Sequence, residues 1–348
     1  MIKSLAQSSL LRLAACFLGV CLVVFQVSAL IPLVWSKAWV MRDLQCYLTA
    51  AQNLVAHRSI YDAPRVYYPD LVPRWYLYPP QLALIMAPLA HASYMTVFRV
   101  WYVAEFLCYW TYAAMLARIV MGRWVLDKTL MAGVALWLTP FMGTIIVAEN
   151  IDTFLWVLYG LGFLLPARGV FWSLIAQFKP FTVPALLVAC FAEGRRVWLP
   201  AGIMMATGYG MALALCGPHE FRTWITLTPS IVGQGTTWES NLSPVFALAR
   251  LAAVSRHLDF SRPLSPDVRH LFTAVQALAI GAAMFKTRRM PVEYRYAIVT
   301  AATLLSSPIC WANYVPILLM VPALYLRDAR SRATDDVLEP HAVLKTAR

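Results

Sequence analysis

Two charged residues stand where apolar segments of the sequence end or break. Asp43 follows the first long apolar segment, and Lys179 directly precedes Pro180 between two shorter ones. The carboxylate of Asp43 could accept a proton from a sugar hydroxyl as a general base, form a surface ion pair, or sit as an acid at a helix N-terminus. The ammonium of Lys179 could line a cavity, or extend along its alkyl chain to a membrane surface.

Further polar and aromatic side chains are expected near the same boundary. The polar set is Asp43, Glu149, Asn150, Asp152, Lys179, Glu220, Arg222, Gln234, Glu239, Asn241 and Asn313. Charged groups close to membrane depth are costly, so they tend to face a cavity or each other. The aromatic residues Trp75, Tyr76, Tyr78 and Trp238 are either anchors at the membrane surface or stacking surfaces for a sugar ring.

The composition excludes an ordinary water-soluble domain. Of the 348 residues, 60% are hydrophobic and 13% are charged, whereas soluble domains carry about 25% charged residues. Such a chain needs lipid as part of its solvent, so we expect an all-α polytopic membrane protein. The net charge of +12 does not indicate nucleic-acid binding, because the basic residues stand between apolar segments, where they orient helices by the positive-inside rule.

Cysteine and histidine spacings predict neither a metal site nor a disulfide. The seven cysteines include no CxxC pair, and the six histidines form no HExxH or HxxxH pair. Small buried hydrophobic roles suit the cysteines better. No metal site is therefore expected. No cofactor is expected either.

The elements that must position Asp43 begin with two helices. Leu13 to Trp35 is longer than the apolar part of a signal peptide, which predicts an uncleaved first transmembrane helix with its N-terminus in the cytoplasm. Met41 to Val55 has apolar residues at three- and four-residue steps, which predicts an amphipathic helix lying flat on the outer membrane surface. Pro80 to Ala90 is shorter than the roughly 20 residues of a full span, and is either a half-helix or part of a longer span.

The remaining apolar segments bring the total to about ten spans, some of them short or broken. They are Val97–Val120, Thr129–Val147, Thr153–Leu165, Gly169–Phe178, Phe181–Phe191, Trp198–Cys216, Leu271–Phe285, Tyr296–Leu305 and Pro316–Leu326, with a surface helix at Leu242–Val254. We expect one transmembrane domain over residues 1–326, with outer loops at 36–78 and 217–269. The charged tail 327–348 is expected to be cytoplasmic and disordered. The lysines and arginines between the other segments place those turns in the cytoplasm.

Several short motifs, in order, resemble those of glycosyltransferase family 87. They are Asp43 with Tyr47, Ile60-Tyr61-Asp62, Tyr78-Pro79-Pro80, Pro88-Leu89, Ala176 to Pro180 (AQFKP), Arg195 to Trp198 and Ser307 to Trp311. The resemblance covers about residues 10 to 326. That family comprises bacterial enzymes that use polyprenyl-phosphate sugars, including mannosyltransferases of actinobacterial glycolipids.

The resemblance implies a type C glycosyltransferase fold in a bacterial inner membrane, with the active site on the periplasmic side. Asp43 would be the general base of an inverting transfer from a polyprenyl-phosphate sugar to a glycolipid or polysaccharide acceptor. Lys179, with Arg42 or Arg222, would stabilise the departing phosphate. Residues implied in substrate binding are Arg42, Tyr78, Glu149, Asn150, Lys179, Gln234, Trp311 and Asn313.

Two departures from the family pattern keep other interpretations open. Glu149-Asn150 stands where the family often has Gly-Gln, and Asn313 stands near a position commonly occupied by His. One alternative is a transporter or flippase of lipid-linked sugars, although no internal repeat typical of transporters is visible. The other is a catalytically degenerate homologue that acts as a membrane subunit.

Overall fold

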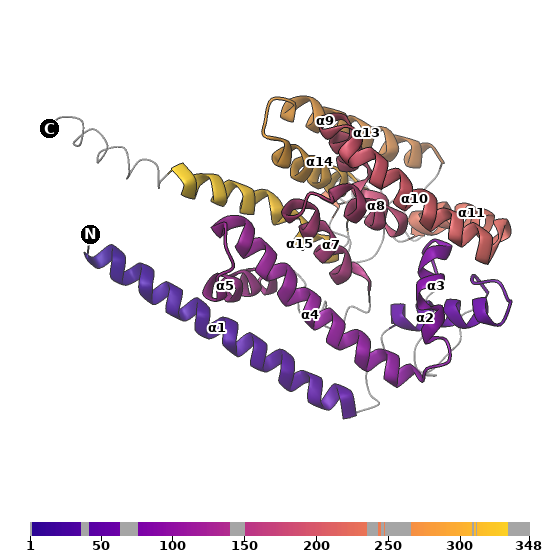
Figure 1. The fold of residues 1–348 in the computed structure, drawn as a ribbon, viewed down its shortest axis with the longest axis horizontal. Coiled ribbons are helices and arrows are strands. Elements are labelled where there is room, and N and C mark those ends of the chain that lie inside the picture. The colour runs from indigo at the N-terminus through magenta and orange to yellow at the C-terminus, as the bar shows by residue number, and fades with distance from the viewer. Residues whose placement is uncertain are drawn as a thin grey trace, which may run out of the picture.

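The computed structural model describes residues 2–35, 42–62, 76–139, 150–234, 243–244, 247, 266–307, 310 and 312–332. Within these residues the regular structure is entirely helical, as expected (Figure 1). The main helices are α1 (Ile2–Trp35), α2 (Arg42–Val55), α3 (Pro80–Met86), α4 (Tyr94–Met121), α5 (Leu126–Trp137), α7 (Asp152–Leu164), α8 (Arg168–Phe178), α9 (Val183–Glu193), α10 (Arg195–Cys216), α11 (Pro218–Gln234), α13 (Pro266–Thr287) and α14 (Val292–Ser306). Shorter turns of helix are η1 (Ala87–Leu89), η2 (Pro180–Thr182), η4 (Ala312–Tyr314) and α15 (Val315–Leu318), and residues 320–332 are also helical.

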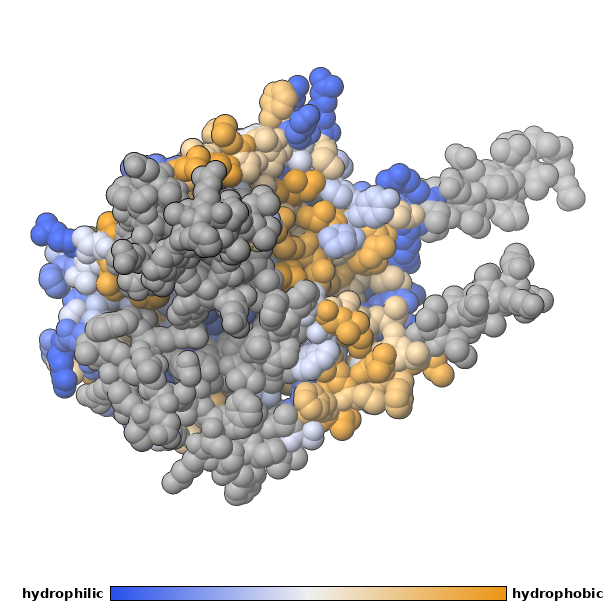
Figure 2. All heavy atoms as spheres, turned by 180° about the vertical axis from the view of Figure 1, so that it is seen from behind, coloured by the Kyte–Doolittle hydropathy of each residue, from blue (hydrophilic) through white to orange (hydrophobic). Residues whose placement is uncertain are grey.

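Two helices, α4 and α10, are long and apolar enough to cross a membrane by length and composition. The described part of α1 contributes a shorter apolar stretch, Arg12–Ser28. In the coloured part of the face in Figure 2, hydrophobic residues gather in the middle and hydrophilic residues lie mostly toward the edges. The total of about ten spans stays a prediction.

Residues 80–90, expected to be either a half-helix or part of a longer span, form only a short helix. α3 and η1 together run from Pro80 to Leu89, which at 1.5 Å per residue is about half the hydrocarbon thickness of a bilayer. Pro80 begins this helix, and the 3₁₀ turn that follows contains Pro88. Residues 80–90 therefore form a half-helix.

Helix α7 lies at the centre of the packing, against α4 and α8. Trp156 and Tyr159 of α7 and Trp172 of α8 are fully buried, and the rings of Tyr159 and Trp172 stack with centroids 6.0 Å apart. Gly162 allows this approach, because a Cβ there would come within 2.1 Å of the Trp172 indole nitrogen. These contacts fix the start of α7 relative to the break after α8.

Two expectations need correction, one for the surface of α2 and one for the start of the tail. Helix α2 does not lie with a polar face in water: Gln45 and Thr49 are each 2% exposed, because α3 and α4 pack around the helix. The outer location of residues 217–269 stays a prediction; this segment begins with helix α11, whose Glu220 accepts hydrogen bonds from the Ser59 hydroxyl and the Ile60 backbone N–H. The tail is not disordered from Arg327: helical structure continues to residue 332, since Arg327 pairs with Glu293 and Asp328.

Figure 1 shows how the helix ends are distributed. The start of α1 and the yellow helix at 320–332 lie at one end of the molecule, whereas α2, α3 and α11 lie at the other. The expected surface helix at 242–254 lies outside the described residues, apart from three single positions. The end that holds α2 carries the residues considered next.

Candidate functional site

Helix α2 places Asp43 in its first turn, where a negative charge is favoured by the helix dipole. One turn further on, Tyr47 is 1% exposed, and Leu44 and Leu48 beside it are fully buried. These buried residues hold the start of α2 against the rest of the bundle. Asp43 itself is half-buried.

Asn150 connects Asp43 to the interior of the protein. Its Nδ2 donates a hydrogen bond to Asp43 Oδ2 at 3.1 Å. Its Oδ1 accepts from the hydroxyl of Tyr78 at 2.7 Å, from the hydroxyl of Tyr47 at 3.3 Å and from Lys179 Nζ at 3.3 Å. Three donors on one side and a carboxylate on the other determine the orientation of the amide.

Lys179 forms a buried ion pair with Asp152. Lys179 Nζ lies 2.7 Å from Asp152 Oδ1, and the two side chains are 10% and 3% exposed. The second carboxylate oxygen of Asp152 accepts from Asn313 Nδ2 at 3.2 Å. Asn313 is held in turn by its backbone carbonyl, which accepts a hydrogen bond of 2.8 Å from the Trp156 indole. Both oxygens of this buried carboxylate thus have a partner, as a buried charge requires.

Tyrosine rings surround the ammonium of Lys179. Its Nζ lies 5.5 Å from the ring centroid of Tyr78 and 5.0 Å from that of Tyr314, which are cation–π distances. The rings of Tyr47 and Tyr78 meet edge to face at 5.2 Å. Burial raises the pKa of Tyr78 to about 12, although Lys179 opposes the shift, so its hydroxyl remains a proton donor to Asn150 at neutral pH.

Local sequence explains why Lys179 reaches this position. Pro180 lacks a backbone N–H and disfavours helical geometry in the residue before it. Lys179 accordingly has an extended backbone with φ −141° and ψ 111°, and it ends α8. Asp152 opens α7, where an acid suits the helix N-terminus, and Asn150 lies two residues earlier. Two helix ends and the start of α2 therefore meet.

Six of the residues singled out from sequence come together in one network: Asp43, Tyr78, Asn150, Asp152, Lys179 and Asn313. Glu149 and Trp311 lie outside the described residues, as do the side chains of Arg42 and Gln234. Asp152 was expected near the same boundary, yet its role as the partner of Lys179 was missed. Tyr47 was noted beside Asp43, but its hydrogen bond to Asn150 was not expected. Tyr314 was missed, because a tyrosine in an apolar segment carries no distinctive sequence signal.

The network couples a carboxylate to a cation through one amide. Such an arrangement suits a reaction in which a hydroxyl loses its proton while an anionic group departs. Among the described residues, no group of three or more His, Cys, Asp or Glu side chains could hold a metal ion.

Comparison with known proteins gives one match. The profile of glycosyltransferase family 87 matches residues 76–308, which include Tyr78, Asn150 and Lys179 but begin after Asp43 and end before Asn313. No curated protein and no solved structure matches the chain. The match spans more than half of the sequence, and together with the apolar helices it indicates a membrane protein. The chain belongs to glycosyltransferase family 87.

Proposed function

We propose that this protein transfers a sugar, mannose or another hexose or pentose, from a polyprenyl-phosphate donor to a lipid or glycan acceptor. The observation that carries the proposal is the hydrogen-bonded link from Asp43 through Asn150 to Lys179. Such a transfer needs a group that accepts the proton of the acceptor hydroxyl and a cation that stabilises the leaving phosphate. Asp43 and Lys179, joined through one amide, could supply both. The family supports glycosyl transfer in general.

In the proposed reaction the acceptor hydroxyl attacks the anomeric carbon of the donor sugar. Asp43 takes the hydroxyl proton as the new carbon–oxygen bond forms. The bond from the anomeric carbon to the phosphate oxygen breaks on the opposite face, and its electron pair leaves with polyprenyl phosphate. The anomeric centre is inverted. The donor supplies its own anionic leaving group, so the proposal includes no cofactor.

Lys179 is proposed to stabilise the leaving phosphate. An ammonium group has three N–H donors; Asp152 and Asn150 accept from two, and the Tyr314 hydroxyl also interacts with the group. A phosphate oxygen is proposed to take the place of the Tyr314 hydroxyl when the donor binds. Because Asp152 offsets the charge of Lys179, a second cation would strengthen the site, and Arg42, adjacent to Asp43 in sequence, is the proposed source.

The remaining sequence-derived roles complete the proposal. Glu149, Gln234 and Trp311 are proposed to contact the sugar or the acceptor, near Tyr78 and Asn313. The site would face the periplasm of a bacterial inner membrane, because the turns richest in lysine and arginine would lie in the cytoplasm. The lipid donor would then reach Lys179 from the bilayer and the acceptor would approach Asp43 from the aqueous side.

Purified full-length protein incubated with labelled polyprenyl-phosphate sugars and candidate membrane lipids tests this proposal. We expect a labelled, inverted glycoside with at least one donor, and loss of that product in the Asp43→Asn variant. In liposomes, movement of the labelled donor between leaflets without any product would favour a transporter instead. Equal rates of transfer in the wild type and Asp43→Asn would refute the assignment of the base.

A further inference from the structure

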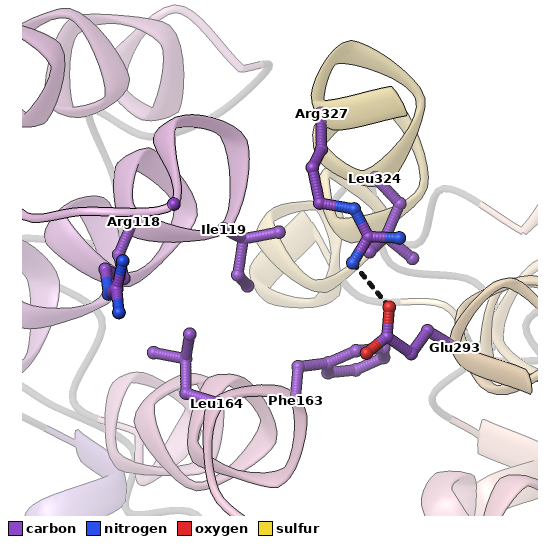
Figure 3. Close-up of a pocket in the computed structure, with 8 residues that line it drawn as sticks. Arg118, Ile119, Phe163, Leu164, Glu293, Leu324 and Arg327 are labelled. Atoms are coloured by element: carbon purple, nitrogen blue, oxygen red, sulfur yellow. Dashed lines mark hydrogen bonds and ion pairs between the residues drawn. The ribbon is translucent and has the colours of Figure 1, made fainter. Parts of the chain in front are cut away.

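A pocket of about 190 Å³ lies between α4, α7, α14 and the helix at 320–332. Figure 3 shows Arg118 and Arg327 on two sides of it, with the apolar side chains of Ile119, Phe163 and Leu164 between them. Glu293 and Leu324 complete the side formed by α14 and the last helix. The lining thus combines two guanidinium groups and one carboxylate with an apolar floor.

This pocket is separate from the Asp43 site. Asp152 opens α7 and belongs to the Lys179 network, whereas Leu164 ends α7 and lines the pocket. Likewise, Trp101 near the start of α4 contacts Tyr47, whereas Arg118 lies in the last turn of that helix. The two sites therefore lie at opposite ends of α4 and α7.

The charges at the pocket favour an anionic ligand. Arg327 pairs with Glu293 through Nη1 and donates from Nε to Asp328 at 2.9 Å. Within the described part of the chain, the contact found for the Arg118 guanidinium is a cation–π approach to Trp124 at 6.0 Å. Arg118 is not needed to cap α4, because Arg330 donates to the Met121 carbonyl at 2.7 Å.

The surroundings of the pocket point to a lipid rather than to a soluble anion. Trp124 and Leu126, just beyond the end of α4, are 62% and 76% exposed, and Tyr325 and Leu326 of the last helix are 64% and 55% exposed. Large exposed apolar and aromatic side chains are typical of the level where headgroups meet acyl chains. Basic pockets between helices at that level bind anionic headgroups.

We propose that the pocket binds the phosphate of an anionic membrane lipid, with Arg118 as the principal contact. The phosphate would lie between Arg118 and Arg327, and the acyl chains would lie along the exposed apolar residues beside the pocket. Glu293 and Asp328 offset the charge of Arg327, whereas Arg118 has no acidic partner among the described residues, so the unbalanced positive charge of the pocket lies on Arg118. A zwitterionic headgroup, whose own cation cancels the phosphate charge, would bind more weakly.

Purified full-length protein tests the proposal through lipid-induced changes in melting temperature, with phosphatidylglycerol, phosphatidylcholine and inorganic phosphate as separate additives. We expect phosphatidylglycerol to raise the melting temperature of the wild type. In Arg118→Gln the apparent affinity should fall roughly tenfold or more, because charge-assisted hydrogen bonds to the phosphate are lost. Arg123→Gln is the matched control, since Arg123 is exposed nearby and does not line the pocket.

A second variant separates binding from any folding defect. Leu164→Trp fills the pocket while both arginines remain, so it should also abolish the response to phosphatidylglycerol. Native mass spectrometry of the wild type should show phosphatidylglycerol retained in preference to phosphatidylcholine. Equal stabilisation of all four proteins by phosphatidylglycerol, or of the wild type by phosphatidylcholine, would overturn the proposal. An equal, Arg118-dependent effect of inorganic phosphate would overturn the assignment to a lipid.

Discussion

Asn150 holds the carboxylate of Asp43 by a hydrogen bond of 3.1 Å from its Nδ2 to Asp43 Oδ2. The opposite side of the same amide accepts a hydrogen bond of 3.3 Å from Lys179. A single residue two positions before α7 thus sets the relative position of a proton acceptor on α2 and a cation at the end of α8. Substitutions of Asp43, Asn150 and Lys179 can therefore test the proton acceptor, the bridging amide and the cation one at a time.

Replacement of Asp43 by asparagine should reduce sugar transfer at least about a hundredfold, because the amide keeps the shape of the carboxylate but cannot take a proton. Melting temperature and membrane insertion should be unchanged. The rate of product formation from labelled donor measures the effect. Asp62→Asn is the matched control, since Asp62 is exposed in the same outer segment and should transfer at the wild-type rate.

Asn150→Leu should lower transfer by roughly tenfold to a hundredfold, because hydrogen bonds to two charged groups are lost. Asn150→Asp should instead place a second carboxylate beside Asp43. Two carboxylates at that distance do not both ionise readily, so the acid limb of the pH–rate profile should move to higher pH. An unchanged acid limb in an active Asn150→Asp enzyme would argue against Asp43 as the base.

The effects of substituting Lys179 and Asp152 on the unfolding free energy should not be additive, because the two side chains form a buried ion pair. Lys179→Met or Asp152→Leu alone leaves one buried charge unpaired, which should cost about 3–5 kcal/mol of unfolding free energy. The double variant should recover most of that stability, yet should still bind the polyprenyl-phosphate donor weakly. Thermal unfolding in detergent and donor titration measure the two effects.

The exposed ion pair of Arg12 and Asp127 is the control for the substitutions of Lys179 and Asp152. Arg12 Nε lies 2.5 Å from Asp127 Oδ2, but the Arg12 side chain is 59% exposed. Solvent screens such a pair, so Arg12→Gln should change the unfolding free energy by no more than about 1 kcal/mol.

Donor affinity equal to the wild type in the Lys179→Met, Asp152→Leu double variant would contradict a phosphate-binding role for Lys179.

Tyr78→Phe removes the 2.7 Å hydrogen bond to Asn150 while keeping the ring beside Lys179. We expect a loss of about fivefold to tenfold in transfer rate, consistent with one hydrogen bond. Since burial raises the pKa of Tyr78 to about 12, the hydroxyl stays protonated up to moderately alkaline pH. The ratio of wild-type to variant rates should therefore be the same at neutral and mildly alkaline pH. A ratio that falls toward one with rising pH would show that Tyr78 ionises earlier.

Much of the helical framework could be predicted from apolar segment lengths and from proline positions. Val97 to Val120 became α4 (Tyr94–Met121), and the predicted break at Lys179-Pro180 separates α8 from α9. The helix continuing beyond Arg327 could not be predicted, because the charged residues there meet distant partners: Arg327 pairs with Glu293, and Arg330 donates to the Met121 carbonyl. Burial of the polar face of α2 could not be predicted from sequence either, because it depends on how α3 and α4 pack around that helix.

The sequence by itself determined that the chain is apolar, helical and interrupted at Lys179, because composition and proline geometry are local properties. It also singled out Asp43, Asn150 and Lys179, since charged and amide groups beside apolar segments are rare. Only the tertiary structure decided that Asp152 is the partner of Lys179 and that Asn150 bridges it to Asp43. Hydrogen bonds between residues more than one hundred positions apart, as from Asn150 to Asp43, depend on how whole helices pack, which local patterns do not record.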